Sequence, residues 1–125
     1  MRGTLLLLES EKSLVDVDVL RANGLMVYDC HELAEAVKQL QRVAPDVILA
    51  VLSERDSPSI VSPLRRLTDD ATSIIVASVP EYREAAREEG ADSFLSSSAD
   101  VSDVLYEIHR ALILRRSGRR LPWNW

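Results

Sequence analysis

The chain has 125 residues, of which 46% are hydrophobic and 28% are charged, and its formal net charge is -5. This composition is ordinary for one soluble globular domain, and the negative charge argues against a general nucleic-acid binder. No apolar run reaches the roughly 20 residues that cross a bilayer, and a single cysteine rules out an internal disulfide. We therefore expect a single-domain cytoplasmic protein.

Strand-like and helix-like segments alternate along the chain. In chain order we expect a strand at 4–8, a helix at 13–23, a strand at 25–28, a helix from 33 to the Pro45-Asp46 pair, a strand at 47–52, a helix at 60–68, a strand at 74–77, a helix at 81–89, a strand at 94–95 and a helix from about 100 to 116. Gly24 and Gly90 are placed to end helices, and Ser98 or Asp100 to cap the last one. Five strands that alternate with five helices predict an α/β fold with a doubly wound parallel sheet.

Three segments carry a resemblance to a known family. They are Pro45-Asp46-Val47-Ile48-Leu49, Ser73-Ile74-Ile75-Val76-Ala77-Ser78 and Gly90-Ala91-Asp92-Ser93-Phe94-Leu95. In this order and spacing they resemble the third strand, the fourth strand and the approach to the fifth strand in receiver domains of two-component response regulators. The resemblance covers roughly residues 4 to 115 and implies a flavodoxin-like sheet with strand order 2-1-3-4-5. We expect a receiver-like domain at 1–116 and a C-terminal tail at 117–125.

Most of the residues that a working receiver needs for phosphoryl transfer are replaced. By the resemblance, its acidic pair falls on Glu9 and Ser10, its phosphoacceptor aspartate on Val51, its hydroxyl on Ser78, and its Lys-Pro pair on Ser97-Ser98. Valine offers neither a nucleophile nor a metal ligand, and serine cannot replace the ammonium that neutralises a phosphate. We predict a pseudo-receiver that is not an enzyme, with no cofactor and no bound metal, in which Val51 packs in a small apolar patch.

Four alternatives stay open for the function. In the first, the chain is a phosphorylatable receiver that uses an acid near the third strand, either Asp46 or one of Glu54 and Asp56 in the loop expected at 53–59. In the second, it is the regulatory domain of a transcription regulator. In the third, the emptied pocket binds a small molecule, although no glycine-rich phosphate loop supports this. In the fourth, Glu9 and Glu11 retain a weak cation site.

The last predicted helix carries apolar residues on two sides. Its inner face is expected to hold Val101, Val104, Leu105, Ile108, Ala111 and Leu112. Tyr106, Ile113 and Leu114 are expected to project outward near Arg110, and exposed apolar groups beside an aromatic ring and an arginine are typical of interfaces. Receiver domains commonly dimerise or bind partners through their fourth and fifth helices and fifth strand, where Phe94 matches the aromatic switch position. The resemblance therefore implies a protein partner in signalling or a homodimer, unless the tail covers these residues.

Two further features leave several interpretations open. The tail combines arginines with two tryptophans, and it is a docking peptide, a linker stub, a nucleic-acid contact or a solvated end. For the domain alone we expect neither a nucleic-acid nor a membrane partner. Cys30 precedes His31 at the expected start of a helix, and an ordinary free thiol is favoured over a thiol activated by the helix terminus.

Overall fold

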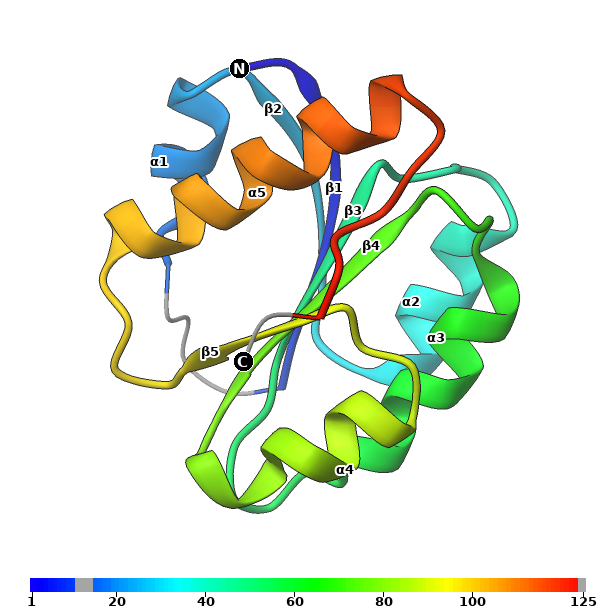
Figure 1. The fold of residues 1–125 in the computed structure, drawn as a ribbon, viewed down its shortest axis with the longest axis vertical. Coiled ribbons are helices and arrows are strands. Elements are labelled where there is room, and N and C mark those ends of the chain that lie inside the picture. The colour runs from blue at the N-terminus through cyan, green and yellow to red at the C-terminus, as the bar shows by residue number, and fades with distance from the viewer. Residues whose placement is uncertain (11–14, 124–125) are drawn as a thin grey trace.

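The computed structural model describes residues 1–10 and 15–123 (Figure 1). The strands are β1 (Gly3–Glu9), β2 (Leu25–Cys30), β3 (Val47–Val51), β4 (Ser73–Ser78) and β5 (Ser93–Ser96). The α-helices are α1 (Val17–Ala22), α2 (Leu33–Leu40), α3 (Val61–Leu67), α4 (Arg83–Glu88) and α5 (Val101–Arg116). Two short 3₁₀ helices, η1 (Pro58–Ile60) and η2 (Pro80–Tyr82), lead directly into α3 and α4. In the described part of the chain, no helix is long and apolar enough to cross a membrane.

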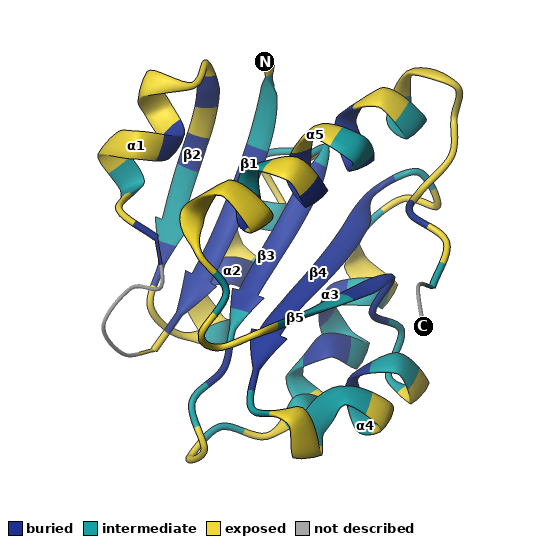
Figure 2. Ribbon diagram, turned by 60° about the vertical axis from the view of Figure 1, so that its left-hand side comes forward, coloured by how far each residue is buried: buried dark blue, intermediate teal, exposed yellow. Residues whose placement is uncertain are grey.

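The strands form one parallel sheet in the order β2-β1-β3-β4-β5, as predicted. α1 and α5 cover one face of the sheet, and α2, α3 and α4 cover the other (Figures 1 and 2). Successive residues of β1 alternate between these faces. Leu5 and Leu7 join the core on the α5 side, while Leu6 and Leu8 join the core on the α2 and α3 side. The doubly wound α/β fold is therefore confirmed.

The boundaries of α1 and β2 differ from the prediction. α1 begins at Val17, because the carboxylate of Asp16 accepts a 2.9 Å hydrogen bond from the backbone N–H of Asp18 and caps the helix there. The expected start at residues 13 and 14 lies outside the described residues. β2 continues to Cys30, so this cysteine ends a strand and does not begin a helix.

Prolines determine how the chain enters α3 and α4. Pro58 and Pro80 each begin a 3₁₀ helix, where the missing N–H costs no helical hydrogen bond. As a result α4 is shorter than the range 81–89 that we predicted. After α4, Gly90 has a φ of 114°, and a Cβ at this position would lie 2.9 Å from Cγ of Arg65. Glycine is therefore required where the chain turns toward β5.

The C-terminal tail packs back onto the domain. β5 pairs with residues 75–78 of β4. At the start of β4, ahead of this paired segment, the backbone N–H of Leu121 donates to Oγ of Ser73 over 2.8 Å. Leu121 is 3% exposed in the core on the α5 side, whereas Trp123 packs against the core on the α4 side. The tail thus passes from the α5 side of the sheet to the α4 side (Figure 2). A solvated end is therefore wrong for Leu121 and Trp123.

Candidate functional site

Four of the positions that the resemblance assigns to phosphoryl transfer lie at the carboxyl ends of strands, along one edge of the sheet. Val51 is the last residue of β3, and its neighbours in register are Glu9 on β1 and Ala77 on β4. Ser78 ends β4, and its carbonyl accepts a 2.9 Å hydrogen bond from the backbone N–H of Ser97. Because the carboxyl ends of parallel strands share an edge, the structure brings Glu9, Val51, Ser78 and Ser97 together.

Val51 occupies the centre of this edge. Its side chain is half-buried and packs against the apolar core between the sheet and α5. This agrees with the expected apolar packing. An isopropyl group has no lone pair, so at this point of the edge there is neither a nucleophile nor an oxygen ligand.

Glu9 and Ser10 point to different partners. Glu9 is buried, with 4% of its surface exposed, and its backbone carbonyl accepts a 3.2 Å hydrogen bond from Nδ1 of His31. A carbonyl can only accept, so this contact requires the proton of the neutral His31 ring on Nδ1. Ser10 donates its hydroxyl to Oδ2 of Asp56 over 2.8 Å. Glu11 lies outside the described residues, and its cation site with Glu9 stays a prediction.

Asp56 lies closer to the site than we expected. It belongs to the loop after β3, as predicted, but its side chain turns back toward the sheet edge. Besides the Ser10 hydroxyl, its Oδ2 accepts the backbone N–H of Ser53 at 2.8 Å and the Ser53 hydroxyl at 3.2 Å. These two contacts are local to a turn, in which the N–H of Asp56 donates to the carbonyl of Ser53. The contact with Ser10 could not be foreseen because the two residues are far apart in the sequence.

Ser78, to which the resemblance assigns the hydroxyl of a receiver, already hydrogen-bonds within the protein. Ser78 is fully buried, and its Oγ donates to the backbone carbonyl of Leu52 over 2.8 Å. Ser96 and Ser98, by contrast, are exposed and hydrogen-bond to each other at 2.9 Å in the turn after β5. Asp100, one of the two expected caps, caps α5 by accepting the N–H of Asp103 at 3.1 Å.

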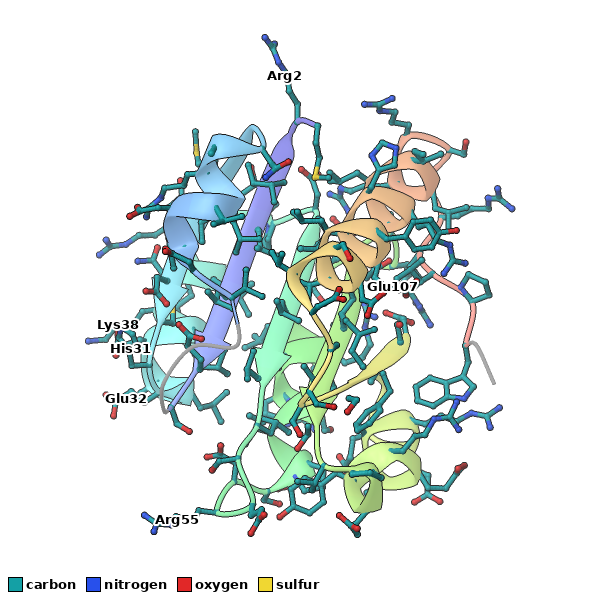
Figure 3. All side chains as sticks on the ribbon, turned by 90° about the vertical axis from the view of Figure 1, so that its left-hand side faces the viewer. Arg2, His31, Glu32, Lys38, Arg55 and Glu107 are labelled. Atoms are coloured by element: carbon teal, nitrogen blue, oxygen red, sulfur yellow. The ribbon has the colours of Figure 1, made fainter. Side chains whose placement is uncertain are left out.

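In the described part of the chain, two hollows adjoin the end of β3. The first has a volume of about 210 Å³ and lies between the ends of β1 and β3 and the start of α2; its lining residues are Leu8, Ser10, His31, Glu32, Leu33, Val51, Leu52, Asp56 and Ile60. The second is wider, about 590 Å³, and is lined by Leu52, Ser53, Glu54, Arg55, Val79 and Ser97. Figure 3 shows His31 and Glu32 together near the start of α2, while the side chain of Arg55 extends away from the protein.

Cys30 is a poor candidate for a reactive group. Its side chain is buried with 1% exposed, and burial, helped by the negative charges of Glu35 and Asp29, raises the pKa of the thiol to about 11. The thiol is therefore protonated at neutral pH. This structure favours the ordinary free thiol over the activated one.

The expected contact surface on α5 is exposed in part. Tyr106 and Ile113 are 64% and 48% exposed, and Cζ of Arg110 lies 6.0 Å from the centre of the Tyr106 ring. The described part of the tail does not cover them, since Leu121 enters the core between the sheet and α5 and Trp123 packs toward α4. Leu114 is a correction: it packs against the core on the α5 side, because it lies three residues after the buried Ala111 and so borders the inner face.

Two more residues near this surface differ from expectation or were missed. Val101, expected on the inner face, is 41% exposed in the first turn of α5. Glu107 is 7% exposed, and its carboxylate accepts from the Ser93 hydroxyl and from Arg110, both at 2.6 Å (Figure 3). Phe94 is half-buried and packs against the core on the α4 side. A buried glutamate has no sequence signal of its own, because its partner Ser93 lies on another element.

Comparisons with known proteins place the fold. No protein-family model and no curated protein matches the chain, but solved structures do. A CheY-like response regulator receiver domain protein from Methanospirillum hungatei JF-1 aligns over 94% of this chain and 99% of its own, with a TM-score of 0.78 and 14% identity. The receiver domain of the Francisella response regulator 1452 aligns over 94% and 100%, with a TM-score of 0.71 and 20% identity.

A third solved structure has the same architecture. It is a LuxR family DNA-binding response regulator from Silicibacter pomeroyi, which aligns over 98% of this chain and 97% of its own with a TM-score of 0.72 and 22% identity. At such identities the likeness establishes the fold alone. The chain therefore has the fold of response regulator receiver domains.

Proposed function

We propose that this chain is a cytoplasmic pseudo-receiver, a signal-transduction module that acts through protein contacts and takes no phosphoryl group. The observation that carries the proposal is the side chain at the end of β3. Val51 lies between Glu9 and Ala77 in the sheet register and packs against apolar neighbours. A phosphoryl acceptor needs a nucleophilic oxygen at this point, and valine has none.

The surroundings of Val51 give little electrostatic support for phosphoryl transfer. The transferred group carries a charge of about -1.5 to -2, which a cation must offset. Ser97 supplies no positive charge, and Lys38 belongs to α2, which packs on β1 and β2, strands that β3 and β4 separate from β5. The Ser78 hydroxyl already donates to the carbonyl of Leu52.

The contact surface in this proposal consists of Tyr106, Arg110 and Ile113 on α5. Two of these three side chains are largely exposed, and the guanidinium of Arg110 is held by the buried Glu107 at 2.6 Å. Such a pre-positioned arginine beside an aromatic ring loses little side-chain entropy when a partner binds. A signalling protein or a second copy of this chain would contact these residues.

One rival has a specific observation in its favour. Asp56 brings a carboxylate to the same cavity as Val51, so a phosphorylatable receiver with Asp56 as its acceptor is the second candidate. Three hydrogen bonds already end on Oδ2 of Asp56. These bonds withdraw electron density from Oδ2 and make it a weaker nucleophile, so an attack by Asp56 would have to come from Oδ1.

Incubation of the full chain with acetyl phosphate and Mg²⁺, followed by intact mass spectrometry, separates the candidates. We expect no gain in mass, while a phosphorylatable receiver treated in parallel gains one phosphoryl group. A gain in the wild type that disappears in Asp56→Asn would replace our proposal with the rival. Addition of beryllofluoride and Mg²⁺ should likewise leave the amide spectrum unchanged.

A further inference from the structure

The cavity beside Val51 lies where α/β sheets of this kind bind ligands. In the order β2-β1-β3, the chain leaves β1 toward one side of the sheet and β3 toward the other, and a crevice forms between the two strand ends. The cavity of about 210 Å³ opens at this point. It offers the space of about seven water molecules at roughly 30 Å³ each.

We propose that this cavity binds a small organic cation, an ammonium group on a short apolar body. The inference rests on the proposed function in one respect: Val51 leaves the site without phosphoryl chemistry. In the described part of the chain the cavity is already open to solvent.

The floor of the cavity is apolar. Leu8 and Leu52 are buried beneath it, and Leu33, Val51 and Ile60 are half-buried at its walls. A hydrated inorganic ion gains nothing from these surfaces, whereas an alkyl or aryl body removes them from water. The floor therefore selects a ligand with an apolar end.

The rim of the cavity is acidic. Asp56 and Glu32 both line it, and the hydrogen bonds that the described residues make to Asp56 all end on Oδ2, which leaves Oδ1 for a ligand. Among the lining residues that the structure describes, the one basic side chain is His31, whose Nδ1 contacts the Glu9 carbonyl and whose Nε2 lies 3.7 Å from Asp29. Arg55 points away from the protein (Figure 3). The rim therefore favours a positive charge.

The combination favours an organic cation over a metal ion. Hard divalent cations bind through several oxygen ligands at once. Among the residues that the structure describes, no three His, Cys, Asp or Glu side chains come close enough together to hold a metal. A rim with the carboxylates of Asp56 and Glu32 above an apolar floor matches an ammonium group with a hydrocarbon body.

A titration of the ¹⁵N-labelled full chain with 2-phenylethylamine tests the proposal. We expect saturable amide shifts confined to residues around the cavity, such as Leu33, Val51 and Ile60, with a dissociation constant of about 1 mM or lower. The anion 3-phenylpropionate, of similar size, should bind at least about tenfold more weakly because it meets Asp56 and Glu32.

Variants identify the site. Asp56→Asn keeps the shape of the side chain but removes its charge, and we expect it to weaken phenylethylamine binding about tenfold. Glu54→Gln removes a charge from the same loop but faces the other hollow, so its affinity should match the wild type. If Asp56→Asn fails to fold, Glu32→Gln tests the same rim, with an expected loss of about threefold.

Several outcomes would overturn the proposal. These are no shifts up to tens of millimolar probe, equal binding of the amine and the anion, or shifts centred on α5. A failure of the proposed function has a different signature, because it appears as a mass gain with acetyl phosphate. The two results are therefore distinguishable.

Discussion

The guanidinium of Arg120, in the tail, donates through Nε to the buried carboxylate of Asp92 over 2.8 Å. Asp92 precedes β5 and is 6% exposed. It also accepts from Arg65 on α3 and from the backbone N–H of Ile74 on β4, both at 2.8 Å. Burial raises the pKa of Asp92, and these hydrogen bonds and charges oppose that shift. One carboxylate thus ties together a helix, a strand and the tail.

The Arg120 contact predicts that the tail stabilises the domain. Arg120→Ala removes one charged partner from Asp92, and we expect it to lower the free energy of unfolding by about 1 to 2 kcal/mol. Arg119→Ala, at an exposed position next to it, should change stability by less than about 0.5 kcal/mol. Urea unfolding measures both. Equal effects in the two variants would mean that the ion pair contributes no stability.

Leu121 provides a larger test of the same tail. Because its side chain is 3% exposed in the core, Leu121→Ala should leave a cavity and cost about 3 kcal/mol. Leu67→Ala is a matched control, since Leu67 is 47% exposed on α3, and we expect it to cost about 1 kcal/mol or less. A similar small cost for both would contradict the packing of the tail against α5.

Asp69 gives the folded protein a defined pH dependence. The hydrogen bonds and charge of Arg115 hold the pKa of Asp69 well below its ordinary value. A depressed folded pKa contributes stability above the unfolded pKa of about 4, and this contribution is lost as the pH falls toward the folded pKa. Asp69→Asn should therefore lower stability by about 1 kcal/mol at pH 7.

The difference between the wild type and Asp69→Asn should narrow as the pH falls below about 4. Urea unfolding at pH 7, 4 and 3 checks this. The exposed neighbour Asp70 provides the control at pH 7, where we expect Asp70→Asn to change stability by less than about 0.5 kcal/mol. A difference for Asp69→Asn that widens in acid would show that the sign of the pKa shift is wrong.

Cys30 should resist thiol reagents in the folded state. With a pKa of about 11, about one thiol in a thousand is ionised at pH 8, and the reactive form is further shielded by burial. We expect dithionitrobenzoate to label Cys30 in urea but not in buffer over an hour. Met26→Cys, at a position that is 61% exposed, should label within minutes. Rapid labelling of native Cys30 would restore the activated-thiol alternative.

The α5 surface predicts the effect of a double substitution. Tyr106→Ala with Ile113→Asp removes two exposed apolar side chains, so we expect it to abolish self-association while the far-UV circular dichroism stays unchanged. Light scattering after size-exclusion chromatography measures the mass. Met26→Asp, on β2 at the side of the sheet farthest from β5, should leave the mass unaltered. A wild type that is monomeric at 0.1 mM or so would contradict the homodimer.

The fold was predictable because its signals are local. Each strand is a short apolar run, Gly24 and Gly90 follow the ends of α1 and α4, and Pro58 and Pro80 begin the 3₁₀ helices that lead into α3 and α4. The boundaries that shifted did so for equally local reasons, such as the cap that Asp16 places at the start of α1. The positions of Val51 and Ser78 at one sheet edge followed from strand order.

The parts that could not be predicted depend on pairs of residues far apart in the chain. Three such pairs each join two distant segments: Asp56 accepts a hydrogen bond from Ser10, Glu107 is buried against Ser93, and Leu121 hydrogen-bonds to Ser73. In the sequence, each of these residues has the pattern of a loop, a surface helix position or a free tail. Three-dimensional packing alone reveals their partners.

By itself the sequence determined the α/β architecture, which follows from periodicity, and the absence of an oxygen from the side chain at position 51, which follows from residue type. Only the tertiary structure decided that a carboxylate from the next loop lines the same cavity as that position and that the tail belongs to the core. The physical reason is that hydrogen bonds and apolar contacts form between neighbours in space, and the chain folds distant residues into those neighbours.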